Sequence, residues 1–388
     1  MEIAQLHQLF LTCNAACTDT RKIIQNDMFF ALKGDNFNGN TYAEQAIAKG
    51  AKYAVVDDAQ YQTSNSIIVV EHVLETLQKL AAFHRKHLNI PIVALTGSNG
   101  KTTTKELINT VLLQKYRTTA TAGNLNNHIG VPLTLLSMTD KTEIGIVEMG
   151  ANHLNEINFL CQIAQPDYGY ITNFGKAHLE GFGSIEGVIK GKSELYDYLK
   201  FHNKTIFVNG NDAIQYEKTL GTNRVVFSEE NQSTQKTNFN INFIEAQPNV
   251  TVRFNNTTVN SELIGAYNFN NISAAIAIGL YFEVETDKIK NAIEHYIPSN
   301  NRSQVIKKGS NTIILDAYNA NPSSMKAALT NFNDLKTDNK IVFLGDMFEL
   351  GKAAKTEHET IADFADSLKV ENIVLIGENF HNTTYASH

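Results

Sequence analysis

Apolar and polar residues alternate along the chain with the periods expected of an α/β protein. Short apolar runs at residues 53–56 and 67–70 predict strands, while apolar spacing of three and four predicts helices at 42–49 and 73–87. The run IVAL then precedes a glycine-containing loop and an amphipathic segment, KTTTKELINTVLLQKY. The predicted order is therefore a small α/β unit, followed by the strand, loop and helix that open a nucleotide-binding domain.

The middle of the chain continues this pattern. Strands are predicted at 144–148, 168–172 and 205–208, with helical stretches between them, which favours a mostly parallel sheet covered on both faces. Between residues 225 and 264 the pattern changes to short strands rich in Asn and Thr, the clearest at 250–254. This change predicts an antiparallel annex.

A third α/β unit is predicted after Pro298, with strands at 312–315, 341–344 and 372–376. A chain of 388 residues is long enough for two or three domains. We therefore predict an α/β protein of three domains, 1–88, 89–297 and 298–388. The central domain should hold a P-loop-type, mostly parallel sheet, flanked by two smaller α/β domains.

Composition narrows the class of partner. Apolar residues make up 43% and charged residues 19%, and the net charge of -7 argues against a general nucleic-acid binder. The three cysteines, Cys13, Cys17 and Cys161, do not suggest a disulfide framework, and no second Cys/His pair completes a zinc site with Cys13 and Cys17. No signal segment and no run of about 18 apolar residues occurs, which predicts a soluble cytoplasmic protein without a membrane partner.

The strongest local motif is TGSNGKTT at residues 96–103, between the apolar strand and the amphipathic helix. It offers backbone N–H groups, a helix N-terminus, the Lys101 amine and the Thr102 hydroxyl, which together suit a nucleotide phosphate with magnesium. Leu95 stands where the first glycine of the standard P-loop belongs. The alternative is an ordinary glycine-rich turn between strand and helix.

Two further polar clusters follow strand ends. Glu148 ends the strand IGIVE and could hold Mg²⁺, although a glutamate there would equally well cap a helix. The segment TNFGKAHLEGFGS brings His178 after another strand, and the next helix, at 184–200, carries Lys192. The plainer interpretation of these two residues is a structural histidine and a solvated charged helix face.

Nine motifs occur in the order seen in Mur ligases, and the chain resembles this family over nearly its whole length. The motifs are TGSNGKTT, GNLNNHIGVP, EMGANH, TNFGKAHLEGFGS, KGKSEL, AYNFNN, NRSQ, DAYNANPSSM and GDMFELG. The GNLNNHIGVP and DAYNANPSSM versions resemble the D-alanyl-D-alanine-adding type. The Asp-Asn-Pro-Arg segment expected of the tripeptide-forming type is absent.

The resemblance implies an ATP-dependent amide ligase of peptidoglycan precursor synthesis. Its partners would be UDP-N-acetylmuramoyl tripeptide and D-alanyl-D-alanine, joined through an acyl phosphate, with ATP and two Mg²⁺ ions as cofactors. In this family the lysine matching Lys192 is carbamylated. The three domains would serve, in order, the UDP-linked substrate, ATP and the dipeptide, and the protein would be a monomer.

The resemblance also implies roles for individual residues. Those matching the catalytic set are Lys101, His178, Lys192 and Arg302. Those matching the metal ligands are Thr102, Glu148, His178 and Lys192. Those matching the nucleotide site are Gly97, Ser98, Asn99, Gly100, Lys101, Thr102, Thr103, Asn268, Asn271, Arg302 and Asp316. Those matching substrate contacts are Asp19, Thr20, Arg21, Asn38, Asn126, Asn319 and Asn321.

Two alternatives stay open at this level. The chain could be an amide ligase of the same superfamily with a different amino-acid acceptor, or a nucleotide-binding descendant without turnover. Members of the family usually continue beyond the last predicted strand with a Lys-Gly-Ser-Arg-type segment and a final helix. The third domain is therefore expected to be incomplete in this sequence.

Overall fold

The computed structural model describes residues 1–230, 237–299 and 301–383, and its elements confirm the predicted α/β class. The chain divides into two compact units. Unit 1 comprises Met1–Ala94, Arg117–Met149 and Asn158–Asp167, and unit 2 comprises Leu95–Tyr116, Gly150–Ile157 and Tyr168–His388. The boundaries of the three predicted domains stay a prediction.

Unit 1 opens with a parallel sheet of strand order β1-β2-β5-β6. The strands of this sheet are short, and β2 and the last three residues of β5 are buried because helices and loops cover them. Its helices α1 and α3 pack against each other. The elements before the second sheet are α1 (Ile3–Phe10), β1 (Ala16–Cys17), β2 (Met28–Phe30), β3 (Lys33–Gly34), β4 (Phe37–Asn38), α2 (Ala43–Ala48), β5 (Tyr53–Val56), β6 (Ile67–Val69) and α3 (Val73–Leu88).

The largest sheet has nine strands in the order β15-β14-β13-β12-β11-β10-β7-β9-β8. In unit 1, β8 pairs in parallel with β9. In unit 2, β10, β11, β12 and β13 run parallel to one another, and β13, β14 and β15 form an antiparallel meander. The strands are β7 (Ile92–Thr96), β8 (Thr118–Ala120), β9 (Ile144–Glu148), β10 (Tyr168–Ile171), β11 (Thr205–Asn209), β12 (Arg224–Ser228), β13 (Phe239–Glu245), β14 (Thr251–Phe254) and β15 (Thr257–Asn260).

The predicted annex is thus partly right. Its strands β13, β14 and β15 are antiparallel, but β13 also pairs in parallel with β12, so the strands extend the large sheet and do not form a separate one. The change in sequence pattern marks a change in strand direction. Pairing between β12 and β13 depends on long-range contacts that a local pattern does not contain.

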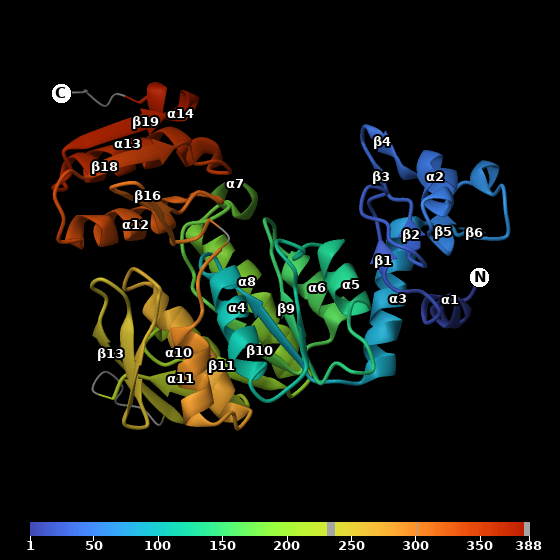
Figure 1. Cartoon of the computed structure of the whole chain (residues 1–388), viewed down its shortest axis with the longest axis horizontal. Coiled ribbons are helices and arrows are strands. Elements are labelled where there is room, and N and C mark those ends of the chain that lie inside the picture. The colour runs from blue at the N-terminus through green and yellow to red at the C-terminus, as the bar shows by residue number, and fades with distance from the viewer. Residues whose placement is uncertain (231–236, 300, 384–388) are drawn as a thin grey trace. The chain divides into compact units, whose positions relative to one another are not determined.

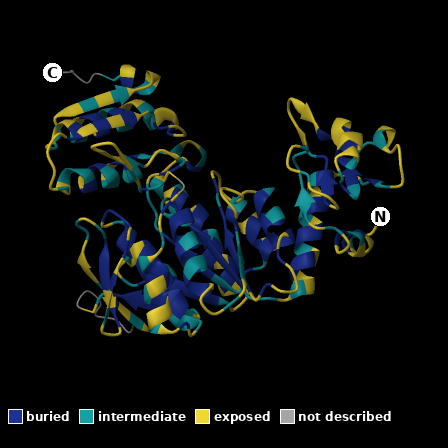
Figure 2. Ribbon diagram, viewed as in Figure 1, coloured by how far each residue is buried: buried dark blue, intermediate teal, exposed yellow. Residues whose placement is uncertain are grey.

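Residues in the middle of this sheet are mostly buried, whereas many residues in the C-terminal part of the chain are exposed (Figure 2). All five residues of β11 are buried, as expected of a central strand covered on both faces. In unit 2, α4 packs on α10, and Figure 1 shows α10 and α11 side by side. The helices of this part are α4 (Lys101–Leu112), α5 (Gly130–Leu136), α6 (Glu156–Ala164), α7 (Leu179–Phe182), α8 (Ile185–Phe201), α9 (Ala213–Lys218), α10 (Asn268–Tyr281) and α11 (Thr286–Glu294).

The C-terminal part of unit 2 contains two separate small sheets. The strands predicted at 312–315, 341–344 and 372–376 are confirmed, but the first of them pairs with β16 in an antiparallel hairpin, while β18 and β19 pair in parallel. Residues of β18 alternate between exposed and buried, since one face packs on a core from α12, α13 and α14. The elements are β16 (Gln304–Lys308), β17 (Asn311–Leu315), α12 (Pro322–Asp334), β18 (Ile341–Gly345), η3 (Gly351–Ala353), α13 (Ala354–Asp366), β19 (Asn372–Ile376) and α14 (Glu378–His381).

Two observations bear on the predictions from composition. The three cysteines are free thiols, with Cys161 buried and the other two partly buried. Among the described residues, no helix combines the length and the apolar character that a bilayer crossing requires.

Candidate functional site

The segment at residues 97–100, here called the phosphate loop, connects β7 to α4. Gly97 has φ +143° and Gly100 has φ +76°, conformations that L side chains rarely adopt. A Cβ atom at Gly97 would also collide with Oγ1 of Thr172. The loop therefore requires both glycines of the TGSNGKTT motif.

Lys101 begins α4 and folds back over the phosphate loop. Its Nζ donates to the carbonyl oxygens of Gly97 at 2.8 Å and Ser98 at 3.1 Å. The N–H groups of the first helical turn have no acceptor within the helix, and the helix dipole adds partial positive charge there. The start of α4 is therefore suited to bind an anion, with Thr102 and Thr103 buried in its first turn.

The end of β10 holds the phosphate loop in place through Asn173. The side chain of Asn173 donates to the carbonyl oxygen of Asn99 at 3.0 Å and accepts from the Asn99 N–H at 3.1 Å. The Ser98 N–H donates to the carbonyl oxygen of Asn173 at 3.1 Å. Two loop amides are thus committed to Asn173, which leaves the anion-binding role to the amides that begin α4. Asn173 belongs to the segment TNFGKAHLEGFGS, in which the sequence predicts a role only for His178.

Asn268 and Asn271, predicted to contact adenine, are buried in α10. The Asn271 Oδ1 accepts a hydrogen bond from the Thr104 hydroxyl at 2.9 Å, and its Nδ2 donates to Asn268 at 2.8 Å. The first of these bonds joins α10 to α4, and the second lies within α10. The predicted contact with adenine stays a prediction.

Lys192 lies in α8 and is completely buried. Its Nζ donates to the carbonyl oxygen of Ala151 at 2.9 Å and lies 5.1 Å from the centroid of the Phe182 ring. Burial, with a contribution from the Lys101 charge, holds the pKa of the Lys192 amine well below its usual value. The interpretation of this helix position as a solvated charged face is wrong for Lys192.

His178 lies immediately before α7 with a left-handed backbone, φ 53°. Its Nδ1 forms a short hydrogen bond with the carboxylate of Glu349, a residue of the GDMFELG motif. Burial lowers the pKa of His178, as do the charges of Lys192 and Lys101, whereas Glu349 acts in the opposite direction. We call His178, Lys192 and Glu349 the His–Lys centre. The GDMFELG motif is one of the nine that carry the family resemblance, but the resemblance gave Glu349 no role.

Glu148 ends β9 in unit 1 and is buried. Its Oε1 accepts a hydrogen bond from the Asn126 side chain at 2.8 Å, and its N–H donates to the Thr121 hydroxyl at 2.9 Å. A glutamate at the end of a buried parallel strand fits the predicted magnesium ligand. Asn126 was predicted to contact substrate, and its observed hydrogen bond is with Glu148.

The metal ligands suggested by the sequence differ in how well they fit a cation. The Glu148 carboxylate and the Thr102 hydroxyl offer the oxygen atoms that Mg²⁺ prefers. An unmodified Lys192 ammonium is not a metal ligand, so the His–Lys centre fits a metal ion only if the lysine is carbamylated. Within the described ranges, no group of three or more His, Cys, Asp and Glu side chains is arranged to hold a metal ion.

Of the predicted site residues in the C-terminal part, one is hydrogen-bonded to the phosphate loop in the described part of the chain and the others are not. Asn321 caps α12 and its Nδ2 donates to Oδ1 of Asn99 in the phosphate loop at 2.6 Å. The Arg302 guanidinium lies 4.0 Å from the centroid of the Tyr318 ring. Asp316 and Asn319 are exposed. Only Asn321 of these residues has a hydrogen bond to the phosphate loop among the described side chains.

The residues predicted to recognise the UDP moiety lie in unit 1. Arg21 forms a bidentate ion pair with Asp19, with N–O distances of 2.9 and 2.7 Å. The Thr20 carbonyl oxygen accepts from Lys49 at 3.0 Å, and Asn38 caps the short 3-10 helix that follows β4. Their predicted contact with substrate stays a prediction.

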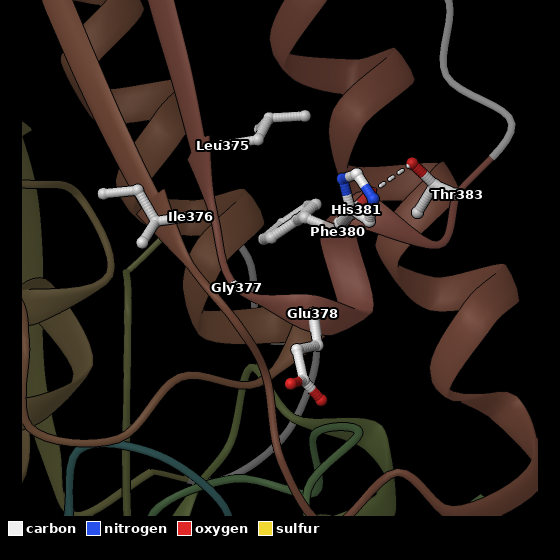
Figure 3. Close-up of a pocket in the computed structure, with 7 residues that line it drawn as sticks. All are labelled: Leu375, Ile376, Gly377, Glu378, Phe380, His381 and Thr383. Carbon is white, nitrogen blue, oxygen red and sulfur yellow. Dashed lines mark hydrogen bonds between the residues drawn. The ribbon is translucent and has the colours of Figure 1, made fainter.

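A cavity of about 680 Å³ in unit 2 contains none of the predicted site residues. It is lined by Leu375, Ile376, Gly377, Glu378, Phe380, His381 and Thr383, of β19, α14 and the residues around them (Figure 3). Most of these groups are apolar and the one carboxylate, Glu378, would repel a phosphate. We do not assign the candidate active site to this cavity.

Family models match three consecutive parts of the chain. The model described as Mur ligase family, catalytic domain, matches residues 15–86; the Mur ligase middle domain matches 95–279; and the Mur ligase, glutamate ligase domain, matches 301–387. The middle-domain match contains the phosphate loop, Glu148, His178 and Lys192, and the third match contains Glu349 and Asn321.

Individual relatives agree with these matches. The chain is 35% identical to the UDP-N-acetylmuramoyl-tripeptide--D-alanyl-D-alanine ligase of Bacillus subtilis, over 94% of this chain and 80% of the relative. It is 32% identical to the ligase of the same name from Escherichia coli, over 97% of this chain and 84% of the relative.

Solved structures give the same result. A crystal structure of MurF from Acinetobacter baumannii superimposes with a TM-score of 0.82 at 29% identity, covering 97% of this chain and 86% of that one. The Thermotoga maritima MurF ligase in complex with ADP gives a TM-score of 0.79 at 26% identity, covering 94% and 88%.

Proposed function

The chain belongs to the Mur ligase family, and from this premise we propose that it joins D-alanyl-D-alanine to UDP-N-acetylmuramoyl tripeptide at the expense of ATP. The observation that carries the proposal is the phosphate loop, with Lys101 at the start of α4 and the His–Lys centre, with its buried Lys192, in the same compact unit. The names of the Bacillus subtilis and Escherichia coli relatives supply the substrates.

The chemistry requires an activated carboxylate. A free carboxylate is a poor electrophile, so the terminal carboxylate of the tripeptide would first attack the γ-phosphorus of ATP, releasing ADP and forming an acyl phosphate. The amine of D-alanyl-D-alanine would then attack the acyl carbon, and phosphate would leave with the former carboxylate oxygen. One amide bond forms and one ATP is converted to ADP and phosphate.

Electrostatic stabilisation would come chiefly from the phosphate loop. The first step brings two anions together, and catalysis of phosphoryl transfer is mostly positioning and charge stabilisation. The Lys101 amine, which contacts two loop carbonyl oxygens in this structure, would bind phosphate oxygens, together with the amides that begin α4. The ADP complex of the Thermotoga maritima relative supports nucleotide binding by this chain.

Magnesium would be held by Thr102 and Glu148, and a second ion by His178 and a carbamylated Lys192. Mg²⁺ supplies charge neutralisation between the phosphate and the carboxylate. Carbamylation requires a neutral amine, which attacks CO₂ to give a carbamate anion and a proton. Burial and the lowered pKa of Lys192 favour that neutral form.

The remaining roles follow the family pattern. Asn268, Asn271, Arg302 and Asp316 would serve the nucleotide. Asp19, Thr20, Arg21, Asn38 and Asn126 would serve the UDP-linked substrate, and Asn319 and Asn321 the dipeptide. We also expect a cytoplasmic monomer that acts in peptidoglycan synthesis, and hence in cell shape and division.

Phosphate release from ATP tests the proposal. With Mg²⁺ and UDP-N-acetylmuramoyl tripeptide present, we expect release that depends on D-alanyl-D-alanine and does not occur with single amino acids. Release with another acceptor would instead indicate an amide ligase of different specificity. ATP binding without release in the presence of any acceptor would indicate a binding protein and contradict the proposal.

A further inference from the structure

His178 and Glu349 share an unusual backbone conformation. Both are non-glycine residues with positive φ, 53° for His178 and 61° for Glu349. Such conformations cost roughly 1–3 kcal/mol each and persist where the surrounding structure enforces them, often at functional sites. The two strained residues are 171 positions apart in the sequence and meet directly.

Two contacts join these residues and their neighbours. The Glu349 carboxylate bonds to Nδ1 of His178, and the N–H of Glu180 donates to the Glu349 carbonyl oxygen at 3.0 Å. Helix α7, which follows His178, also packs on η3, which follows Glu349. Backbone and side chain of Glu349 are therefore both fixed relative to His178.

A neighbouring contact shows that attachment of these segments does not need the strain. Lys176, two residues before His178, forms an ion pair with Glu357 at 2.7 Å. Neither residue has a positive φ. An electrostatic contact between the two segments is thus also made by residues in ordinary backbone geometry, so positive φ is not needed for contact alone.

The hydrogen bond determines the tautomer of His178. An ionised carboxylate can only accept hydrogen bonds, so Nδ1 of a neutral imidazole must carry the proton and Nε2 keeps its lone pair. Metal-binding histidines are commonly oriented in this way by a carboxylate on the other ring nitrogen. The His178 side chain is 18% exposed and that of Glu349 is 43% exposed, so the imidazole is largely shielded from water while the carboxylate stays accessible.

We propose that Glu349 is a positioning residue that holds His178 in the Nδ1–H tautomer, with Nε2 available as a metal ligand. This inference rests on the proposed function, which places a metal ion at His178. Because Glu349 belongs to the C-terminal part of unit 2, the metal site is complete only when the GDMFELG segment lies against α7. Binding at the His–Lys centre is thereby linked to the segment that follows β18.

The first test is the tautomer itself, measured from imidazole ¹⁵N shifts in the metal-free full-length protein. We expect the Nδ1–H form for His178 in the wild type and a shift toward the Nε2–H form in Glu349→Ala. Glu349→Asn is a second variant, because asparagine tolerates a positive φ and its side chain is one methylene shorter. An Nε2–H tautomer in the wild type would overturn the proposal.

The second test is Mn²⁺ binding in the presence of ADP, without tripeptide or dipeptide. We expect Glu349→Ala and Glu349→Asn to weaken Mn²⁺ binding by about 10-fold, the lower limit usual for loss of such a partner. Glu349→Gln should restore part of the affinity, since its amide oxygen can still accept from Nδ1. Equal Mn²⁺ affinity in the wild type and in both folded variants would contradict the proposal.

Glu357→Gln is the matched control. It removes a carboxylate that joins the same two segments through Lys176 but does not touch His178, so tautomer and Mn²⁺ affinity should stay as in the wild type. A loss equal to that of Glu349→Ala would mean that docking alone matters and would overturn the positioning role. Failure of the proposed function would instead appear as missing phosphate release in the wild type.

Discussion

The phosphate loop takes its geometry from one short stretch of sequence, whereas the His–Lys centre is assembled from distant segments. In the loop, Gly97, Gly100 and Lys101 lie within five consecutive residues. In the His–Lys centre, His178 and Glu349 are separated by 171 positions. The loop depends on backbone conformations that glycine permits, and the centre depends on side chains brought together by folding.

This difference indicates how each region should respond to change. The loop is covalently continuous and its conformation is set largely by two glycines, so a side-chain replacement there should remove chemistry without unfolding the chain. In the His–Lys centre Lys192 is buried and His178 is largely covered, so a replacement of either residue changes charge and packing together. Variants in the two regions can separate these effects.

The largest effect is expected for Lys101→Ala in the phosphate loop. Its amine is the charged group closest to the loop carbonyl oxygens, and removal of such a group from a phosphoryl-transfer site typically costs about 10³-fold or more in turnover. We expect turnover to fall at least that far while the unfolding temperature changes little. Phosphate release and a thermal melt measure the two quantities.

Lys176→Ala is the control for Lys101→Ala. Lys176 is half-exposed, pairs with Glu357 and does not contact the loop carbonyl oxygens, so its removal should change turnover by less than about threefold. Turnover of Lys101→Ala within 10-fold of the wild type would contradict the role given to the phosphate loop.

The next largest effect is expected for Lys192→Met in the His–Lys centre. The methionine side chain is similar in length to that of lysine and apolar, so it can occupy the buried position, but it cannot become a carbamate. Turnover should therefore fall by about 100-fold. Stability should stay within about 2 kcal/mol of the wild type, because losing the bond to Ala151 is offset by no longer burying an amine. Turnover and urea unfolding measure both.

Wild-type enzyme in CO₂-depleted buffer provides the comparison for Lys192→Met. Activity should fall and return when bicarbonate is added, while the activity of Lys192→Met should not respond. Full turnover by the methionine variant would show that the lysine is structural.

A smaller effect is expected at Asn321, which joins helix α12 to the phosphate loop. Its Nδ2 donates to Asn99 of the phosphate loop, while its Oδ1 caps α12 by accepting from the Ser324 N–H at 2.9 Å. Asn321→Ser keeps a capping hydroxyl but is too short for Asn99. We expect kcat/KM to fall about fivefold, which corresponds to about 1 kcal/mol.

Asn321→Ala separates the two roles of this side chain. It should show the same loss in kcat/KM and a further loss of about 1 kcal/mol in stability, because the cap is also removed. A loss of kcat/KM in Asn321→Ala but not in Asn321→Ser would assign the effect to the cap alone.

Local features of the fold and site could be predicted from the sequence. The strand at 53–56 is an apolar run between polar stretches and appears as β5, and the phosphate loop follows from its glycines and lysine. Helix α4 ends at Leu112, four residues earlier than the predicted helix, since residues 113–115 turn and lose the helical hydrogen-bond pattern.

Features that depend on distant partners could not be predicted. The pairing of β17 with β16, the bond from Asn126 to Glu148 and the Glu349 carboxylate on His178 each join residues by tertiary contact. Burial of Lys192 is of the same kind, because a lysine on a helix gives no local sign that the facing elements will cover it. The family resemblance identified His178 and Lys192, but it did not identify Glu349.

The smallest effect concerns an imidazole that is buried without a carboxylate partner, and it serves as a reference for His178. His7 of α1 is buried, its Nε2 lies 2.9 Å from Nδ1 of His84 in α3, and its Nδ1 has no hydrogen-bond partner within the described chain. Burial first, and then the charges of His84 and His87, lower the pKa of His7 to about 4. Folding therefore favours the neutral ring.

The sign of the pH effect follows from this lowered pKa. The folded state binds fewer protons than the unfolded state, so the contribution of His7 is complete above its unfolded pKa of about 6.5 and is lost as pH falls toward 4. His7→Gln can still donate to His84 but does not titrate. We expect it to be about 1 kcal/mol less stable than the wild type at pH 7.5, because ring packing is lost. By pH 4.5 the wild type should lose about 1–2 kcal/mol relative to the variant, so that the two become equal or the variant becomes the more stable. Urea unfolding at both pH values measures this change. A stability difference that stays constant would mean that burial of the His7 imidazole does not make folding depend on pH. His7 could then not serve as the carboxylate-free comparison for His178.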